Sequence, residues 1–139
     1  MGICFNSLQL TASPDTAQKI LNKGFEGCES GDLGVTPQNF SFRPFVTATQ
    51  PSQVDDYTSE LEQIWTNWID GEPTANQKSQ QDKQLTIEFE SEDIPPLRTV
   101  RAMIAWLEQE QLHFELRYRY RQENETWQGE LSASNPNIH

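Results

Sequence analysis

The chain has 139 residues, a formal net charge of −11 and a pI of about 4.5. A chain of this length is expected to build one domain with its own core. The negative charge argues against direct binding of nucleic acid, because contacts to phosphates require a basic surface, and it fits a basic protein partner.

The first two expected elements are a strand and a helix. Apolar and polar residues alternate over most of 3–11, the pattern of a half-buried strand, although Asn6 falls on the apolar face. Ser13 has the position of a helix N-cap and Pro14 that of the first helical residue. A helix is therefore predicted over 14–23.

The next segment is predicted to be a loop followed by a short strand. Residues 24–39 contain four glycines. A phosphate-binding loop is the alternative interpretation, but neither the GxGxxG nor the Walker spacing is present. Residues 40–47 are predicted to form a strand or an extended segment. Pro44 favours an edge position or a bulge, because proline donates no hydrogen bond to a ladder.

An amphipathic helix is predicted over 53–68. Ser52 and Asp55 have the spacing of a capping box at its start, and apolar side chains recur at helical spacing after it. Trp65 and Trp68 are interpreted as core residues because they continue this apolar stripe. The stripe consists of Val54, Tyr57, Leu61, Ile64, Trp65 and Trp68.

The segment 85–131 is predicted to form strand, helix, strand, turn and strand. Apolar residues alternate over 85–90, 112–120 and 127–131, and they recur at helical spacing over 96–110 after a pair of prolines. The two strands joined by the helix are expected to run parallel, and the last two strands to form an antiparallel hairpin.

This order of elements is that of the second half of a ferredoxin-like α+β sandwich. We therefore predict one ferredoxin-like domain over 1–139, with a mostly antiparallel sheet and helices on one face. Long loops are expected at about 24–39 and 70–83. The acidic amphipathic helix is an addition to this plan.

Several segments of the chain match motifs of a known family in order and spacing. They are C-F-N-S-L-Q-L-T at 4–11, F-S-F at 40–42, I-W-T-N-W-I-D at 64–70, F-E-S with its later proline pair at 89–96, and the segment 120–129 with Trp127. In these segments the chain resembles the YubB-like proteins, small plasmid- and phage-borne proteins with a ferredoxin-like domain and no established activity. The resemblance implies that fold and an origin in a mobile element, and it implies no active site.

The sequence indicates no catalytic, cofactor or metal site. His113 and His139 are the only histidines, and no cysteine or histidine pair has the spacing of metal ligands. Cys4 and Cys28 are expected to be reduced thiols, because neither a signal peptide nor a long apolar run is present. We therefore expect a non-enzymatic protein in the cytoplasm of a bacterial host, without membrane contact.

One alternative is a small enzyme that uses carboxylates of the strand beginning at Leu85, and of the segment just after it, as acid and base. Glu88, Glu90 and Asp93 are its candidate acid–base residues. We favour a solvated strand face instead. In that interpretation, the two strands are neighbours, and Glu88 and Glu90 form ion pairs with Arg117 and Arg119 across the ladder.

The acidic residues are concentrated in one part of the chain. Between Lys23 and Lys78 the sequence holds nine acidic residues and one basic residue, Arg43. An acidic surface on a helix imitates a phosphate backbone and fits a cationic groove of a partner. The candidate partner-binding carboxylates are Asp55, Asp56, Glu60 and Glu62.

The favoured hypothesis is a non-enzymatic inhibitor from a mobile element. It would occupy a cationic surface of a host defence complex that handles nucleic acid, of the anti-CRISPR or anti-restriction type. One alternative is a general phage or plasmid interaction module that uses the sheet face or Trp106, and another is the small enzyme described above. Trp106 is expected about 120° off the apolar stripe of its helix and partly exposed, where it would anchor a partner or a homodimer. The chain is expected to be a monomer or a homodimer.

Overall fold

The computed structural model describes residues 2–26, 39–70 and 83–135. Most of the two predicted long loops lies outside these residues, as do Cys28 and His139. The described chain contains five strands and four α-helices, so its class is α+β, as predicted. In chain order they are β1 (Ile3–Ala12), α1 (Pro14–Gly24), α2 (Arg43–Thr49), α3 (Val54–Glu62), β2 (Ile64–Asp70), β3 (Lys83–Glu92), α4 (Leu97–Gln109), β4 (Glu115–Gln122) and β5 (Gly129–Ser134).

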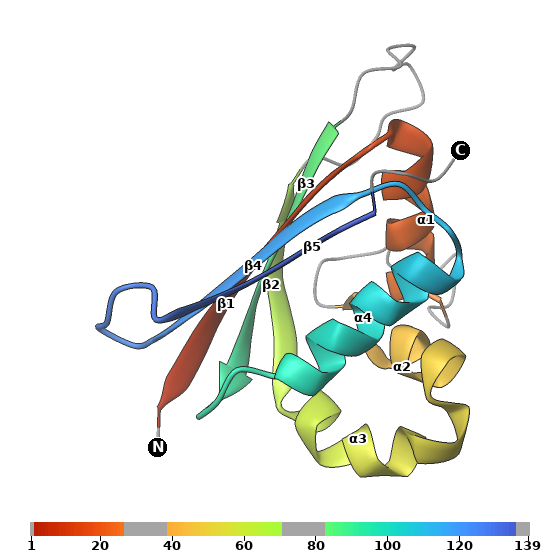
Figure 1. Cartoon of the computed structure of the whole chain (residues 1–139). Coiled ribbons are helices and arrows are strands. Elements are labelled where there is room, and N and C mark those ends of the chain that lie inside the picture. Colours follow the sequence, from red (N-terminus) through yellow and green to blue (C-terminus); the bar gives the residue numbers. More distant parts are fainter. Residues whose placement is uncertain (1, 27–38, 71–82, 136–139) are drawn as a thin grey trace.

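The five strands form one sheet in the order β2-β3-β1-β4-β5. Each strand is antiparallel to its neighbours. The four α-helices lie on the same side of this sheet, and no helix of the described residues lies on the other side (Figure 1). The prediction of an antiparallel-dominated sheet with helices on one face is therefore confirmed.

The first helix begins as its sequence signals predict, and it extends to Gly24, one residue beyond the predicted range. The Ser13 hydroxyl accepts a hydrogen bond from the backbone N–H of Thr16 at 3.2 Å, and Pro14 occupies the first turn. Gly24 closes the helix beneath the ring of Phe40. A Cβ added at residue 24 would approach that ring to 1.9 Å, so only glycine fits at this close approach.

The hydrophobic core lies between the sheet and its helical layer. β1, β3 and β4 direct alternate apolar side chains toward α1, α2 and α4. Full burial of each such side chain contributes about 1.5–3 kcal/mol. The core includes Leu8, Leu10, Ile20, Phe42, Phe45, Ile87, Phe89, Val100, Met103, Leu107, Leu116 and Tyr118.

The predicted strand over 40–47 is wrong. Phe40 and Phe42 are buried, but the backbone turns into α2 at Arg43. Pro44 occupies the first turn of this helix, where its missing N–H costs nothing because the first helical donors have no partner within the helix. The proline that favours a strand edge in the sequence is therefore a helix-start proline.

The predicted helix over 53–68 is also wrong in its second half. The helix α3 ends at Glu62, and the next residues form β2. A bulge between Thr66 and Trp68 adds one residue to this strand. In a regular strand, residues three apart point to opposite faces, whereas the bulge places Trp65 and Trp68 on one face and so imitates helical spacing.

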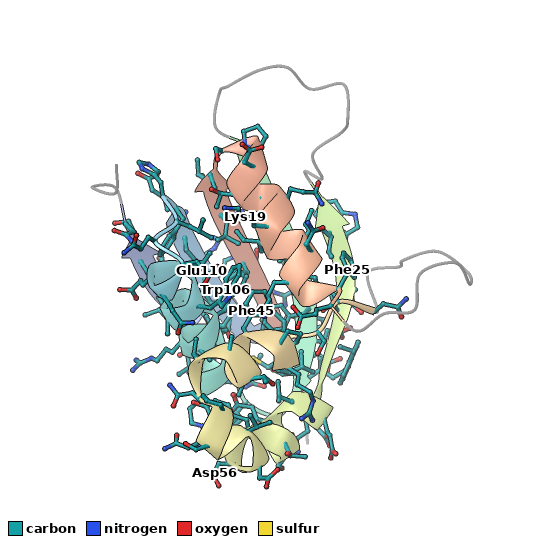
Figure 2. The ribbon with its side chains drawn as sticks, turned by 90° about the vertical axis from the view of Figure 1, so that its right-hand side faces the viewer. Lys19, Phe25, Phe45, Asp56, Trp106 and Glu110 are labelled. Atoms are coloured by element: carbon teal, nitrogen blue, oxygen red, sulfur yellow. The ribbon has the colours of Figure 1, made fainter. Side chains whose placement is uncertain are left out.

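The expected partial exposure of Trp106 is wrong as well. Its side chain is only 6% exposed, and its ring packs edge-on against Phe45 of α2 with 5.2 Å between the centroids (Figure 2). This contact exists because 43–49 is a helix that covers α4, which the predicted strand would not have done.

The expected pairing of β3 glutamates with β4 arginines does not occur, because β1 lies between these strands. β3 and β4 do run in the same direction, since each is antiparallel to β1. Glu88 faces Ser7, and Ser7 faces Arg119 on its other side. Strands separated by a third strand are about 10 Å apart, which is too far for a direct ion pair.

Candidate functional site

The sheet surface opposite the helices is the candidate functional site, and we call it the open face. Successive residues of a strand point to opposite sides, so the residues between the core positions point to the open face. They include Phe5, Ser7 and Gln9 on β1, Thr86, Glu88 and Glu90 on β3, and Arg117, Arg119 and Arg121 on β4.

Three of the four tryptophans of the chain lie on the open face, and all three are exposed. Trp65 and Trp68 of β2 are 41% and 47% exposed, and Trp127, just before β5, is 43% exposed. The interpretation of Trp65 and Trp68 as core residues is therefore wrong. Exposed tryptophans that gather on one surface are typical of binding sites, because their large rings gain much from being covered.

The β2–β3 side of the open face is acidic. Glu90 accepts a hydrogen bond from the indole N–H of Trp65 at 2.8 Å and another from the side-chain amide of Asn67. Glu88 is exposed and is the register partner of Trp68. The Glu90 carboxylate therefore joins the Trp65 indole to the bulge residue Asn67.

The β4 side of the open face is basic, and its guanidinium groups rest on aromatic rings. Arg121 lies over the ring of Phe5, with its Cζ 4.6 Å from the ring centroid, and Arg119 lies over Trp127 at 4.5 Å. Arg117 forms an ion pair with Glu130 of β5. Stacking on a ring fixes a guanidinium without using its five N–H donors. Arg121 directs one of these donors to the Glu125 carbonyl at 3.5 Å, and its others can contact a partner.

The acidic and basic residues stand level with one another across β1. Glu90 and Arg121 are both register partners of Phe5, and Glu88 and Arg119 are level with each other two residues further along β1. The open face therefore carries an acidic strand and a basic strand on either side of a central aromatic residue.

A shallow hollow of about 530 Å³ lies toward the other end of the open face. Its lining is mostly polar and uncharged, and the residues that form it come from the four strands β1, β3, β4 and β5. The lining includes Gln9, Thr11, Gln84, Arg117, Ser132 and Ser134. The surface is thus concave beside the charged and aromatic band.

The predicted partner-binding carboxylates are located on α3, away from the open face. Asp55, Asp56 and Glu62 are exposed, and Figure 2 shows Asp56 at the far end of the helical layer. Glu60 is different. Its carboxylate accepts hydrogen bonds from the N–H and the hydroxyl of Thr99, at 3.0 and 2.6 Å, in the first turn of α4, so it stabilises that helix start.

Trp106, the remaining predicted contact residue, lines a separate hollow of about 300 Å³ between α1 and α4. Lys19 and Glu110 lie at the same hollow (Figure 2). Because Trp106 is nearly covered by its neighbours, little of its ring is accessible to a partner.

A buried polar group lies beneath the open face, on the core side of the sheet. The Asn6 side-chain N–H₂ is 3.1 Å from the Ser91 hydroxyl and 3.3 Å from the Phe89 carbonyl, and the Tyr118 hydroxyl donates to Asn6 Oδ1. Burial raises the pKa of the Cys4 thiol and that of the Tyr118 hydroxyl. Both groups are therefore neutral near pH 7, and the arrangement is structural.

Two of the three carboxylates of the enzymatic alternative already accept hydrogen bonds within the chain. Glu90 is bound by Trp65 and Asn67, and Asp93 accepts a hydrogen bond from the Gly2 N–H at 2.8 Å. Within the described residues, no group of three histidine, cysteine or acidic side chains is arranged to hold a metal ion. His113 is exposed.

The sequence alone does not single out four of the candidate contact residues, which are Phe5, Trp65, Trp68 and Trp127. Two features of the sequence could have identified them. Apolar and polar residues alternate in β1 and just before β5, and β2 is rich in aromatic and β-branched residues, which favour strands. The helical spacing of the two β2 tryptophans masks that signal.

No family model, curated protein or solved structure matches the chain. None of the helices in the described ranges is both long and apolar enough to span a membrane. The function is therefore inferred from the surface itself.

Proposed function

We propose that the protein is a non-enzymatic binding module that contacts a protein partner through the open face. The observation that carries the proposal is the gathering of Trp65, Trp68 and Trp127, all exposed, on one helix-free sheet surface. Tryptophan and arginine are the side chains that most often dominate the energy of protein–protein contacts. Stacked arginines and a fixed glutamate add directional polar contacts to this surface.

A protein fits this surface better than a nucleic acid does. Aromatic rings and arginines on an open sheet also suit single-stranded nucleic acid. Here, however, Glu88 and Glu90 lie beside the central strand, and the chain carries a net charge of −11. Phosphates would be repelled by both, whereas a protein can present opposite charges to each strand.

We further propose that the protein originates from a mobile element and inhibits a host defence complex. The resemblance to YubB-like proteins and the acidic composition support this role, in which binding blocks a surface of the target without turnover.

The strand order is consistent with an elaborated ferredoxin-like fold: β1 lies between the strands joined by α4, and β3 lies between β1 and β2. β5 extends that plan at one edge.

The second candidate is the acidic surface of α3. Asp55, Asp56 and Glu62 are exposed on one short helix, and a basic groove of a defence effector would attract them. Binding through these carboxylates would weaken steeply as the salt concentration rises, because exposed charges are screened over about 8–10 Å. Glu60 is excluded from this surface by its structural bonds to Thr99.

The experiment identifies a partner and then assigns the surface. Tagged protein captures candidates from a host lysate, mass spectrometry identifies them, and the dissociation constant is measured with the purified pair. We expect Trp65→Ala, Trp68→Ala and Trp127→Ala to weaken binding by about tenfold or more each. Asp55→Lys, Asp56→Lys and Glu62→Lys are the matched control variants and should change it by less than about twofold.

The opposite pattern would assign binding to α3 and overturn the open-face proposal. Affinity that none of the six variants changes would overturn both candidates. Melting temperatures of all variants should stay close to that of the wild type, since every altered side chain is exposed.

A further inference from the structure

We propose that two copies of this chain pair face to face through their open faces, around a two-fold axis that runs along β1. This inference rests on the proposed function, because it names a second copy of the chain as a partner of the open face. Sheets that pack face to face lie about 10 Å apart with their strands within about 30° of each other, and a two-fold dimer uses the same surface on both copies.

The strand order makes the open face suited to this symmetry. β1 is the central strand, β3 and β4 flank it, and β2 and β5 form the two edges. A half-turn about an axis parallel to β1 exchanges the two flanks. β3 of one copy then lies over β4 of the other, and β2 lies over β5.

The charges of the open face become complementary in this arrangement. Because the axis is parallel to β1, the rotation does not move a residue along the strand direction. Two residues at the same height along β1, on opposite flanks of one sheet, therefore meet across the interface. Glu88 then faces the partner subunit's Arg119, and Glu90 faces the partner subunit's Arg121, because each pair is level across β1. Each contact occurs twice, once on either side of the axis, and Phe5 meets its own copy at the centre.

The same charges disfavour the other way of stacking the two sheets. A two-fold axis perpendicular to the strands would place β3 over β3 and bring the glutamates of the two copies together. Like charges that face each other across an interface are strongly unfavourable. The charge pattern therefore selects the axis along β1.

The size of the surface is adequate for a dimer. Five strands about 4.8 Å apart, each roughly 25 Å long, present on the order of 600 Å² per copy. This area approaches the roughly 800 Å² per partner that stable protein complexes bury. The exposed rings of Trp65 and Trp68 over β5, and of Trp127 over β2, would be covered at the two margins.

The test is a charge exchange at the pair formed by Glu88 and Arg119. Analytical ultracentrifugation of the purified wild type between about 1 and about 100 µM should show a monomer–dimer equilibrium. Glu88→Arg alone and Arg119→Glu alone each create two repulsive contacts, and each should weaken dimerisation by at least about tenfold. An equimolar mixture of the two variants should form a heterodimer, because every contact in it is again between opposite charges.

Two further variants make the result specific to this geometry. The double variant Glu88→Arg with Arg119→Glu should dimerise as the wild type does. Glu62→Arg, a charge reversal on α3, is the matched control and should leave the dimer unchanged. Circular dichroism verifies that each variant is folded.

A wild type that stays monomeric over this range overturns the dimer. Single variants that dissociate without recovery in the mixture overturn the axis along β1. Neither failure touches the proposed function, which is decided by the affinity of the tryptophan variants for the captured partner. A dimer that behaves as described, together with tryptophan variants that keep full affinity for that partner, would limit the open face to self-association and overturn its role in binding the captured partner.

Discussion

Asn6 is a polar residue in the buried layer of the sheet, and it joins three strands there. Its side-chain amide contacts the Phe89 carbonyl and the Ser91 hydroxyl on β3, and its side-chain oxygen accepts from Tyr118 on β4. Without the amide, the Tyr118 hydroxyl would be buried without this partner, and the Ser91 hydroxyl would keep only its bond to the Ile94 carbonyl at 2.7 Å. The interruption of the apolar alternation at residue 6 is therefore required by the polar groups around it.

We expect Asn6→Ala to lower the free energy of unfolding by roughly 2–4 kcal/mol, because it leaves the Tyr118 and Ser91 hydroxyls without this partner. Urea denaturation measures the change. Gln9→Ala, on the open face of the same strand, is the control and should stay within about 0.5 kcal/mol of the wild type. The variant Asn6→Leu with Tyr118→Phe should recover part of the loss, since it removes both ends of one buried bond. An equal loss in Asn6→Ala and Gln9→Ala would contradict this account.

At the scale of the elements, β2 and α2 show how far sequence reasoning reaches. The first strand, the first helix and the segment from β3 to β5 have regular periodicity, which predicts their bounds to within a few residues. β2 was missed because its bulge gives Trp65 and Trp68 the spacing of a helix. α2 was missed because Pro44 is as compatible with a helix start as with a strand edge, and only packing against Trp106 decides between them.

The candidate site was predictable in part, and strand order set the limit. The alternation of β3 and β4 correctly places Glu88 and Glu90, and the arginines of β4, on an exposed sheet face. Which strand lies between them depends on contacts far apart in sequence, and local periodicity carries no information about those. The insertion of β1 separates the glutamates of β3 from the arginines of β4, so they do not pair with each other within the sheet.

The packing of α2 on α4 makes Trp106 the buried tryptophan, whereas helical spacing predicts that Trp65 and Trp68 are the buried ones. The expected effects of tryptophan substitutions on stability are therefore reversed. Trp106→Ala should lower the free energy of unfolding by roughly 3–5 kcal/mol, because a buried ring is replaced by a cavity. Trp65→Ala should cost no more than about 1 kcal/mol, since that side chain is exposed and loses one hydrogen bond. Thermal denaturation of both variants at one protein concentration provides the comparison. A larger loss for Trp65→Ala would show that the open face carries part of the core.

At the scale of the whole molecule, one core connects the sheet with the helices α1, α2 and α4. Side chains from strands and helices interlock in this core, so neither layer keeps its packing without the other. The helix α3 joins the same unit through Glu60 and Thr99, and through Arg98, which lies over the ring of Tyr57 at 4.4 Å. The described chain is therefore one cooperative structure.

This connectivity predicts a single unfolding transition. Helix content followed by circular dichroism and tertiary packing followed by tryptophan fluorescence should give coincident urea curves. The Trp106→Phe variant is the control, because it removes the one buried indole and shows how much of the fluorescence change that residue reports. Loss of the helix signal at lower urea than the fluorescence change would mean that part of the helical layer unfolds independently.

The bulge in β2 also affects how the molecule behaves at high concentration. In the described sheet β2 is an edge strand, and a flat edge offers a row of backbone donors and acceptors to which another chain can add a strand. The extra residue between Thr66 and Trp68 disturbs the spacing of that row and increases its local twist. The irregularity that exposes two tryptophans on the open face thus also interrupts lateral growth of the sheet, and it protects an aromatic edge against assembly into fibrils.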